Sequence, residues 1–165
     1  MFNNLGIHYS HTGDLTRGLV CFDKALELEP DNPDYLYNLC QIYLTQFPDV
    51  AKQRQWSLKK VYRTAMKMSK KAAELGQDYE LIQDYAVNFF AAENFQLKAD
   101  WREAARAWQW ARQNARTTDE EFFTWLNEAR VWIADGNKTK ALACLDAALT
   151  IRPDSEVAAN LKSGL

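Results

Sequence analysis

The sequence has few residues that interrupt helices. Among its 165 residues only six are Gly and four are Pro, while 47% are hydrophobic. This composition is typical of a folded domain, and it favours helices over a sandwich of short strands. A chain of this length fits one domain or one short stack of repeats and can bury a substantial core.

Cysteines and long apolar runs are also scarce. The three cysteines, Cys21, Cys40 and Cys144, are odd in number and form no C-x-x-C pair. This argues against a disulfide framework or a zinc site and favours reduced thiols. No apolar run approaches the ~20 residues of a membrane helix, and the N-terminal residues lack the basic and apolar segments of a secretory signal. We therefore expect a cytoplasmic protein.

The motifs of common enzymes and metal sites are missing as well. There is no phosphate-binding Gly-rich loop, H-E-x-x-H, G-x-S-x-G or calcium-loop spacing. His8 and His11 are the only histidines, and no further side chain at ligand spacing completes a metal site with them. The adjacent Glu120 and Glu121 fall in the first turn of an expected helix, where carboxylates suit the helix dipole. The sequence therefore predicts no enzyme, no metal and no cofactor.

What the sequence does contain is a pattern that recurs four times. The first copy is Phe2-x-x-Leu5-Gly6-x-x-Tyr9, then Gly18-x-x-x-Phe22-x-x-Ala25 and Pro30. The later copies are Leu36-x-x-Leu39-Cys40-x-x-Tyr43 with Ala65-x-x-x-Ser69-x-x-Ala72, Asn88-x-x-Ala91-Ala92-x-x-Phe95 with Ala104-x-x-x-Trp108-x-x-Ala111, and Trp125-x-x-Glu128-Ala129-x-x-Trp132 with Ala141-x-x-x-Leu145-x-x-Ala148 and Pro153. Small residues at fixed places allow two helices to approach closely, and the large residues three further on fill the space between hairpins.

This pattern resembles the tetratricopeptide repeat, W-x2-L-G-x2-Y…A-x3-F…P, at a spacing of ~34 residues. The resemblance implies an all-α, right-handed superhelical solenoid of four helical hairpins plus a short C-terminal capping helix, in a single domain of residues 1–165. A single hairpin cannot bury both its faces, so stacking supplies the core. The expected repeats are 1–32, 33–77 with an insertion, 78–117 and 118–153, followed by the cap 154–165.

Helix ends are marked by turn and capping residues. Gly13-Asp14 and Gly136-Asn137 each place a Gly before an N-cap residue, Asn32 precedes Pro33, and Asp100 begins a helix. The expected helices are 2–12, 14–28, 33–46, 49–75, 78–98, 100–116, 119–134, 137–150 and 155–163. The extra residues of the second repeat are assigned to a lengthened helix 49–75, about 40 Å long at ~1.5 Å per residue. An array that starts inside its first helix is the pattern expected of a segment of a longer protein.

The resemblance also predicts a binding surface. In the family, the first helices of the hairpins line a concave groove that receives an extended peptide or a helix. The matching residues are Asn4, Tyr37, Asn38, Gln41, Phe89, Phe90, Glu93, Phe123, Asn127 and Arg130. Asn4, Asn38 and Asn127 occupy equivalent places, and amides can hold a peptide backbone of any sequence, while the aromatics would form apolar pockets. The alternative is that these Asn residues are common in the family pattern and merely solvated.

One specialised family function can be tested on residues. Members that bind chaperones hold a C-terminal carboxylate with Lys and Asn from three successive repeats. The matching positions are Asn3, Ile7, Asn38, Ala86 and Phe90. Only Asn38 fits and none is basic, which argues against binding of a chaperone C-terminal carboxylate.

A second candidate surface is basic. Between Val50 and Ala73 there are no acids and eight of the chain's 20 basic residues, namely Lys52, Arg54, Lys59, Lys60, Arg63, Lys67, Lys70 and Lys71. All except Arg54 share one face of a helical wheel, so the sequence predicts a basic amphipathic helix over 50–73. It could bind an acidic partner, a membrane surface or nucleic acid, or be only a solvated face. The remaining 12 basic and 22 acidic residues argue against nucleic acid, which prefers a basic domain.

Together these patterns predict a protein-interaction scaffold that binds a peptide or helix of a partner protein in the groove. The alternative is a regulatory or assembly module of a larger protein. It would act through the ends of the repeat array or through the basic residues of 50–73.

Overall fold

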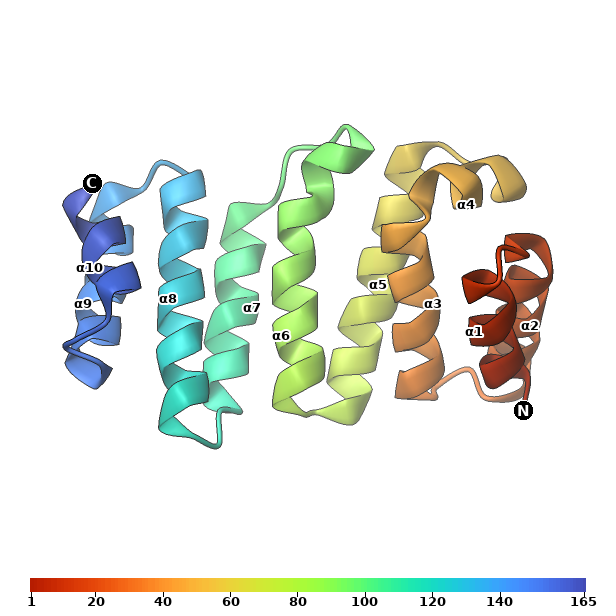
Figure 1. Ribbon diagram of the computed structural model, residues 1–165, viewed down its shortest axis with the longest axis horizontal. Helices are drawn as coiled ribbons and strands as arrows, with labels where there is room; N and C mark the ends of the chain where they lie inside the picture. Colours follow the sequence, from red (N-terminus) through yellow and green to blue (C-terminus); the bar gives the residue numbers. More distant parts are fainter. The chain divides into compact units, whose positions relative to one another are not determined.

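The computed structural model describes residues 1–165 as an all-α structure with ten α-helices, one 3-10 helix and no strand (Figure 1). The predicted all-α class is therefore confirmed. The chain forms two compact units. Unit 1 comprises residues 1–77 and 90–98, and unit 2 comprises residues 78–89 and 99–165. None of the helices combines the length and the apolar character that crossing a membrane requires.

Unit 1 contains two helical hairpins, and the second has an extra short helix. The helices are α1 (Phe2–His11), α2 (Leu15–Leu28), α3 (Pro33–Thr45), α4 (Phe47–Arg54) and α5 (Leu58–Gly76). α1 packs against α2 and α3 packs against α5, while α4 lies between α3 and α5 in the sequence and contacts both. Both α1 and α2 also contact α3, so the two hairpins stack.

The first hairpin depends on two glycines. A Cβ atom at Gly6 would lie 3.0 Å from ring atoms of Phe22, whose side chain is fully buried. A Cβ at Gly18 would overlap the hydroxyl of Ser10 and lie 3.1 Å from the carbonyl oxygen of Gly6. The expectation that small residues permit close approach of the paired helices is confirmed here.

Unit 2 contains the two later hairpins and the terminal helix. The helices are α6 (Tyr79–Val87), α7 (Trp101–Gln113), α8 (Thr118–Ala134), α9 (Lys138–Ile151) and α10 (Glu156–Ser163). The 3-10 helix η1 (Asn88–Phe95) follows α6, and its residues from Phe90 onward belong to unit 1. α6 packs on α7, α7 on α8, α8 on α9 and α9 on α10. Trp108, Leu145 and Val131 lie in this core with at most 1% of their surface exposed.

The predicted N-caps form as expected. The carboxylates of Asp14 and Asp100 accept hydrogen bonds from the backbone N–H groups three residues further on, each at 3.0 Å. Asn137 caps α9 in the same way at 3.1 Å. The turn glycines Gly13 and Gly136 have φ angles of 89° and 76°. Residues with a side chain rarely adopt such angles. Each cap satisfies a backbone donor that the helix itself leaves without a partner.

The prediction of one long helix over 49–75 is wrong, and with it the continuous basic helix 50–73. The chain leaves the helical path at Gln55, whose φ and ψ of 55° and 43° are left-handed, and α5 restarts after Ser57. The Ser57 hydroxyl accepts from the N–H of Lys60 at 3.2 Å. α5 has 19 residues, or about 28 Å rather than about 40 Å. Arg54 bonds to Asp23 of α2 at the break, a contact between distant residues that periodicity cannot reveal.

Because Gln55 is exposed and left-handed, Gln55→Gly should stabilise the fold by about 0.5–1 kcal/mol, since glycine adopts this conformation without a Cβ penalty. Urea unfolding followed by circular dichroism would measure it. Gln53→Gly, two residues earlier and inside α4, is the matched control and should destabilise. A loss of stability in Gln55→Gly would contradict the left-handed assignment.

The predicted helix 78–98 is correct only in part. α6 ends at Val87, the chain continues as a 3-10 helix to Phe95, and Gln96 has a left-handed φ of 60°. Phe95 is fully buried, with ring centroids 4.6 Å from Phe47 and 5.1 Å from Tyr62 in unit 1. A 3-10 helix turns by about 120° per residue instead of about 100°. Side chains after Asn88 therefore point in directions that an α-helical wheel does not give.

Candidate functional site

The groove residues of the first two hairpins form a connected row of amides in unit 1. Asn38 of α3 donates from Nδ2 to Oδ1 of Asn3 at 3.4 Å, and Asn3 donates from Nδ2 to Oδ1 of Asn4 at 3.5 Å. Asn3 is 6% exposed, whereas Asn4 is exposed and Asn38 half-buried. Asn3 thus joins the two predicted groove residues across the contact between α1 and α3. The sequence pattern placed Asn3 only in the chaperone comparison and missed this bridging position.

Tyr37 and Gln41 belong to the same helix as Asn38. Both are half-buried on α3, and Gln41 follows Tyr37 by four residues and Asn38 by three. Residues at such spacings lie on neighbouring parts of a helix surface. They can therefore extend the amide row along α3.

The groove residues of the fourth repeat also form one surface, on α8 of unit 2. Asn127 donates from Nδ2 to the carbonyl oxygen of Phe123 at 2.8 Å and accepts from Arg130 at 2.9 Å. Phe123 is 46% exposed. The amide of Asn127 is thus held within α8, while Phe123 and Arg130 are exposed.

Arg152, which the sequence analysis did not identify, covers part of this surface. Its guanidinium lies 4.5 Å from the ring centroid of Phe122 and 5.5 Å from that of Phe123, and it pairs with Asp119 at 2.5 Å. No local signal in the sequence indicates this contact. It joins the C-terminal end of α9 to the first two turns of α8.

The groove residues predicted in the third repeat are not all at the surface. Phe89 is 6% exposed and packs edge-on against Tyr85, with ring centroids 5.2 Å apart. It therefore belongs to the core of unit 2, where the 3-10 backbone of η1 directs it. Phe90 is 43% exposed and Glu93 is exposed as well.

The basic residues predicted on one helix are divided between two. Lys52 and Arg54 lie on α4, and the other six lie on α5 and are exposed. Lys60 lies over the ring of Trp56, with Nζ 4.1 Å from the ring centroid, and Lys71 pairs with Asp31 at 2.5 Å.

Arg54 has a structural role that the helical periodicity of the sequence does not predict. Its guanidinium binds the carboxylate of Asp23 in a bidentate manner at 2.6 and 2.7 Å, and its Nε donates to the Tyr43 hydroxyl at 3.1 Å. The hydrogen bond with Asp23 raises the pKa of Arg54 above its ordinary value, and partial burial opposes it only in part. Arg54 therefore fastens α4 to the first hairpin and is not part of a free basic surface.

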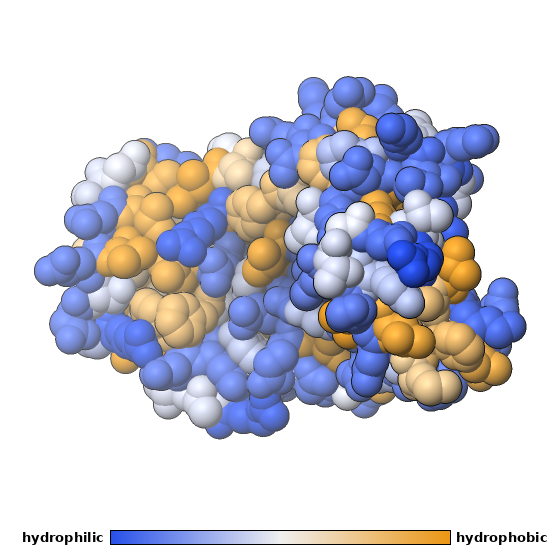
Figure 2. All heavy atoms as spheres, turned by 45° about the vertical axis from the view of Figure 1, so that its right-hand side comes forward, coloured by the Kyte–Doolittle hydropathy of each residue, from blue (hydrophilic) through white to orange (hydrophobic).

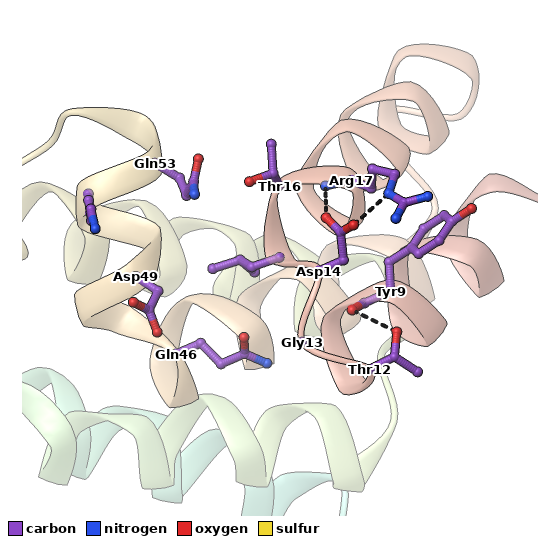
Figure 3. A pocket seen from close by; sticks show the side chains of 11 residues that line it. Tyr9, Thr12, Gly13, Asp14, Thr16, Arg17, Gln46, Asp49 and Gln53 are labelled. Carbon is purple, nitrogen blue, oxygen red and sulfur yellow. Dashed lines mark hydrogen bonds and ion pairs between the residues drawn. The ribbon is translucent and has the colours of Figure 1, made fainter.

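The insertion in the second repeat also creates a polar cleft of about 630 Å³ in unit 1. Figure 3 shows Asp49 and Gln53 of α4 on one side, and Asp14, Thr16 and Arg17 on the other. The cleft is lined by Tyr9, Thr12, Gly13, Asp14, Leu15, Thr16, Arg17, Gln46, Asp49, Lys52 and Gln53. Its two carboxylates and two cations balance one another, and Asp14 is already bound to Arg17. The cleft therefore favours neither anionic nor cationic ligands.

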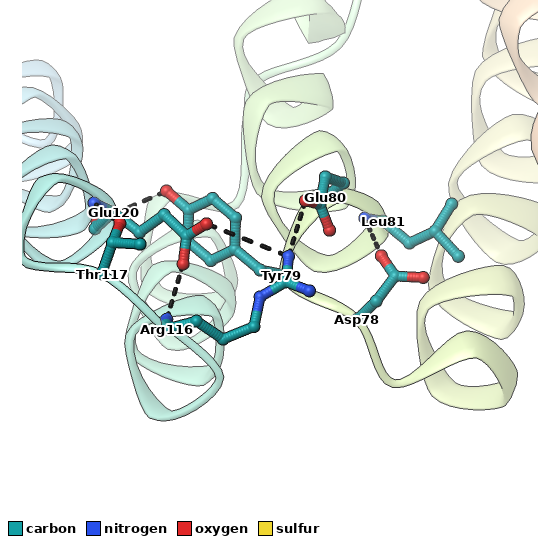
Figure 4. A network of polar contacts seen from close by, with 7 residues as sticks. All are labelled: Asp78, Tyr79, Glu80, Leu81, Arg116, Thr117 and Glu120. Carbon is teal, nitrogen blue, oxygen red and sulfur yellow. Dashed lines mark hydrogen bonds and ion pairs between the residues drawn. The ribbon is translucent and has the colours of Figure 1, made fainter.

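A polar network joins α6 to the start of α8 in unit 2 (Figure 4). Arg116 donates to Glu80 at 2.6 Å, its backbone N–H donates to Glu120 at 2.6 Å, and the Tyr79 hydroxyl donates to the Glu120 carbonyl oxygen at 3.4 Å. Burial raises the pKa of Tyr79 to about 12, with smaller contributions from Glu120 and Glu80. Glu120 thus serves in connecting the hairpins, in agreement with its expected position in the first turn of a helix.

Exposed apolar side chains occur in several separate areas on the face shown in Figure 2. In the first hairpin, Val20 and Leu28 are 64% and 63% exposed. No tryptophan is fully exposed, because all six are buried or half-buried. The aromatic residues of this chain therefore serve mainly in packing, with Phe90 and Phe123 as the exposed exceptions.

Comparison with known proteins places these surfaces in a structural context. Residues 1–32 match the family model described as Tetratricopeptide repeat. No curated protein matches the sequence.

Several solved structures are similar to the whole chain in fold. A structure of MamA has a TM-score of 0.67 and 18% identity and covers 98% of this chain and 76% of its own. PilF of Pseudomonas aeruginosa has a TM-score of 0.62 and 16% identity and covers 99% of this chain, which spans 65% of the length of PilF. YrrB, described as a TPR protein with an unusual peptide-binding site, has a TM-score of 0.50 and 20% identity, and the match covers 98% of this chain and 90% of YrrB.

Identities this low are informative about the fold alone. Residues 1–32 carry the sequence signature, and the similarity in fold extends over 98–99% of the chain. The chain therefore contains a tetratricopeptide repeat at its start and has a helical-repeat fold of the tetratricopeptide type, as the sequence predicts.

Proposed function

We propose that this chain is a protein-interaction module that binds an extended peptide or a helix of a partner along the first helices of its hairpins. The observation that carries the proposal is the amide row Asn38–Asn3–Asn4, which reaches from α3 to α1. YrrB, which is similar in fold, is described as having a peptide-binding site. A helical-repeat scaffold of this type acts by binding, and we propose no catalytic role.

The hydrogen-bonding capacity of the row fits a peptide backbone. Asn4 uses its oxygen to accept from Asn3, so its Nδ2 donors remain for a peptide carbonyl. Asn38 uses Nδ2 to donate to Asn3, so its oxygen remains for a peptide N–H. One donor and one acceptor, held together by the buried Asn3, match the alternating groups of a main chain without reading its side chains.

On α8 the contacts would come from Phe123 and Arg130. Asn127 is occupied by its bonds to Phe123 and Arg130, so its own role is to hold Arg130 in place. Aromatic residues and arginine are enriched in protein interfaces, so these two exposed side chains are suited to contact a partner.

The test is capture of partners with the purified chain, identification of the bound segment, and titration of that segment as a synthetic peptide. The variants Asn4→Ala/Asn38→Ala and Phe123→Ala/Arg130→Ala should each weaken binding about tenfold or more, since each removes contacts worth above about 1 kcal/mol. Fluorescence anisotropy of the labelled peptide gives the dissociation constant.

The matched control is Asn94→Ala/Asn160→Ala, which removes two exposed amides outside the proposed surface. It should bind like the natural sequence. If the Asn4/Asn38 variant is folded by circular dichroism and binds its partner as tightly as the control, the amide row is not the binding site and the proposal fails.

A second candidate function rests on α5. Lys59, Arg63 and Lys67 recur every fourth residue, are exposed and make no ion pair, so they present a basic stripe to which an acidic segment of a partner could bind. Charge reversal of these three residues to Glu belongs in the same capture experiment. Lys60 and Lys71 are spared because they contact Trp56 and Asp31. A partner lost only on charge reversal favours this surface over the groove.

A further inference from the structure

We propose that unit 2 contains a binding pocket for a phosphate group, separate from the groove surfaces. The pocket has a volume of about 220 Å³ and is lined by Arg102, Ala105, Arg106, Gln109, Trp132 and Lys140. These residues come from α7, from the last turns of α8 and from the first turn of α9. The proposal does not depend on the proposed function, because none of the six is a groove residue.

The charges around the pocket are unbalanced. Arg102, Arg106 and Lys140 line it, and no carboxylate does. Arg106 pairs with Glu103 at 3.2 Å, but neither Arg102 nor Lys140 has an ion-pair partner. Lys140 lies over the Trp132 ring, with Nζ 4.0 Å from the centroid. An anion in the pocket would therefore contact two cations without an ion-pair partner, Arg102 and Lys140, and a third, Arg106, that also pairs with Glu103.

The buried carboxylate nearest to this pocket does not neutralise it. Glu128 is 3% exposed and accepts from Gln109 at 2.7 Å, Arg112 at 2.8 Å and Trp132 Nε1 at 3.2 Å. Its oxygens are thus fully engaged inside the unit. These same bonds hold Gln109 and Trp132, two of the lining residues, in fixed positions.

The helix ends strengthen the case for an anion. The N-terminal end of a helix carries a partial positive charge, where acidic side chains are favourable and basic ones unfavourable. The first turn of α9 contains Lys138 and Lys140 and no acid, whereas the first turn of α7 contains both Arg102 and Glu103. At the start of α9, where no acid offsets the two lysines, this arrangement costs stability in the empty protein and favours a bound anion.

The size and the donor types indicate the chemical class. A volume of about 220 Å³ is below the roughly 300–1,000 Å³ of sites for drug-sized ligands. A pocket of this volume can hold a single charged group with a small substituent. Arginine forks bind phosphate and carboxylate oxygens in a bidentate manner. A phosphate monoester carries about −1.5 to −2 charge and so gains more from several cations than a carboxylate does.

Calorimetric titration with sodium phosphate at low ionic strength tests the site. We expect saturable binding, accompanied by an NMR shift of the Trp132 indole N–H. Arg102→Ala/Arg106→Ala should weaken binding about tenfold or more, because it removes both guanidinium groups. The control Lys24→Ala/Lys98→Ala removes two exposed positive charges from unit 1, outside every proposed binding surface, and should change the affinity less than about twofold.

Three results would each overturn the proposal. These are no saturation up to about 20 mM phosphate, an equal loss of affinity in the control, or shifts elsewhere with the Trp132 indole unchanged. Circular dichroism checks that the Arg102/Arg106 variant is folded, and Arg102→Lys/Arg106→Lys provides a second variant that retains charge but loses the fork. It should bind phosphate with an affinity between those of the natural chain and the alanine variant.

The source of the phosphate is decided with three probes. These are inorganic phosphate, a short peptide with a central phosphoserine, and the same peptide with serine. Tighter binding of the phosphopeptide than of inorganic phosphate identifies a phosphorylated protein segment as the ligand, and equal binding identifies free phosphate or a small phosphorylated molecule. If the serine peptide binds as well as the phosphopeptide, the pocket does not recognise phosphate.

Discussion

Gly18→Val is expected to destabilise the first hairpin by about 3 kcal/mol, at the upper end of the usual cost of overpacking. Its Cβ would overlap Ser10 Oγ and lie 3.1 and 3.2 Å from backbone atoms of Gly6 and Ser10. Backbone atoms cannot turn aside as a flexible side chain can. α1 would have to move away from α2, exposing Phe22, which is fully buried.

Urea unfolding monitored by circular dichroism and by tryptophan fluorescence measures this loss. Gly164→Val is the control, because a Cβ at Gly164 has no neighbour closer than 3.6 Å and its φ of −83° suits any residue. A Gly18→Val variant as stable as the control would show that the two helices are not packed as closely as described.

Glu128→Leu is expected to lower the free energy of unfolding of unit 2 by about 3 kcal/mol, because removing one partner of a buried ion pair leaves the other charge uncompensated. The side chains of Arg112 and Glu128 are 17% and 4% exposed. Gln109 and Trp132 would lose their acceptor as well. The guanidinium of Arg112 would keep its position over the Trp125 ring, 3.4 Å from the centroid, which limits the loss.

Glu128→Gln is the informative comparison for this network. It keeps the shape and one acceptor oxygen but removes the charge, so its stability should lie between those of Glu128→Leu and the natural sequence. Thermal and urea unfolding of the three proteins give the order. Equal stability of Glu128→Leu and the natural chain would mean that the ion pair contributes nothing net, as happens when apolar packing replaces a buried pair.

The fold could be predicted from the sequence to the extent that it depends on local signals. Asp14, Asp100 and Asn137 begin helices because their side chains cap the backbone within three residues. The alternation of small and large residues predicted which side chains are buried, and Cys40, Ala92, Ala129 and Phe95 are. Each of these inferences concerns groups that are close together in the sequence.

The site was predicted less completely. Asn4 and Asn38 are both groove residues of the repeat pattern, but the hydrogen bonds that link them run through Asn3, which the pattern does not assign to the groove. Phe89 matches a groove position of the family pattern, but it follows the end of α6, and the 3-10 turn of η1 directs it into the core. Arg152 reaches Phe123 from the end of another helix.

By itself the sequence determined the helical class, the pairing of helices into hairpins and most of the helix ends, because these follow from periodicity, capping and small-residue spacing. Only the tertiary structure decided the break at Gln55, the 3-10 segment at Asn88–Phe95 and the pocket lined by Arg102, Arg106 and Lys140. Each depends on side chains that lie far apart along the chain, such as Arg54 with Asp23 or Phe95 with Phe47. Such contacts determine which of several local conformations of similar free energy the folded chain adopts. Local sequence patterns therefore do not predict these three features.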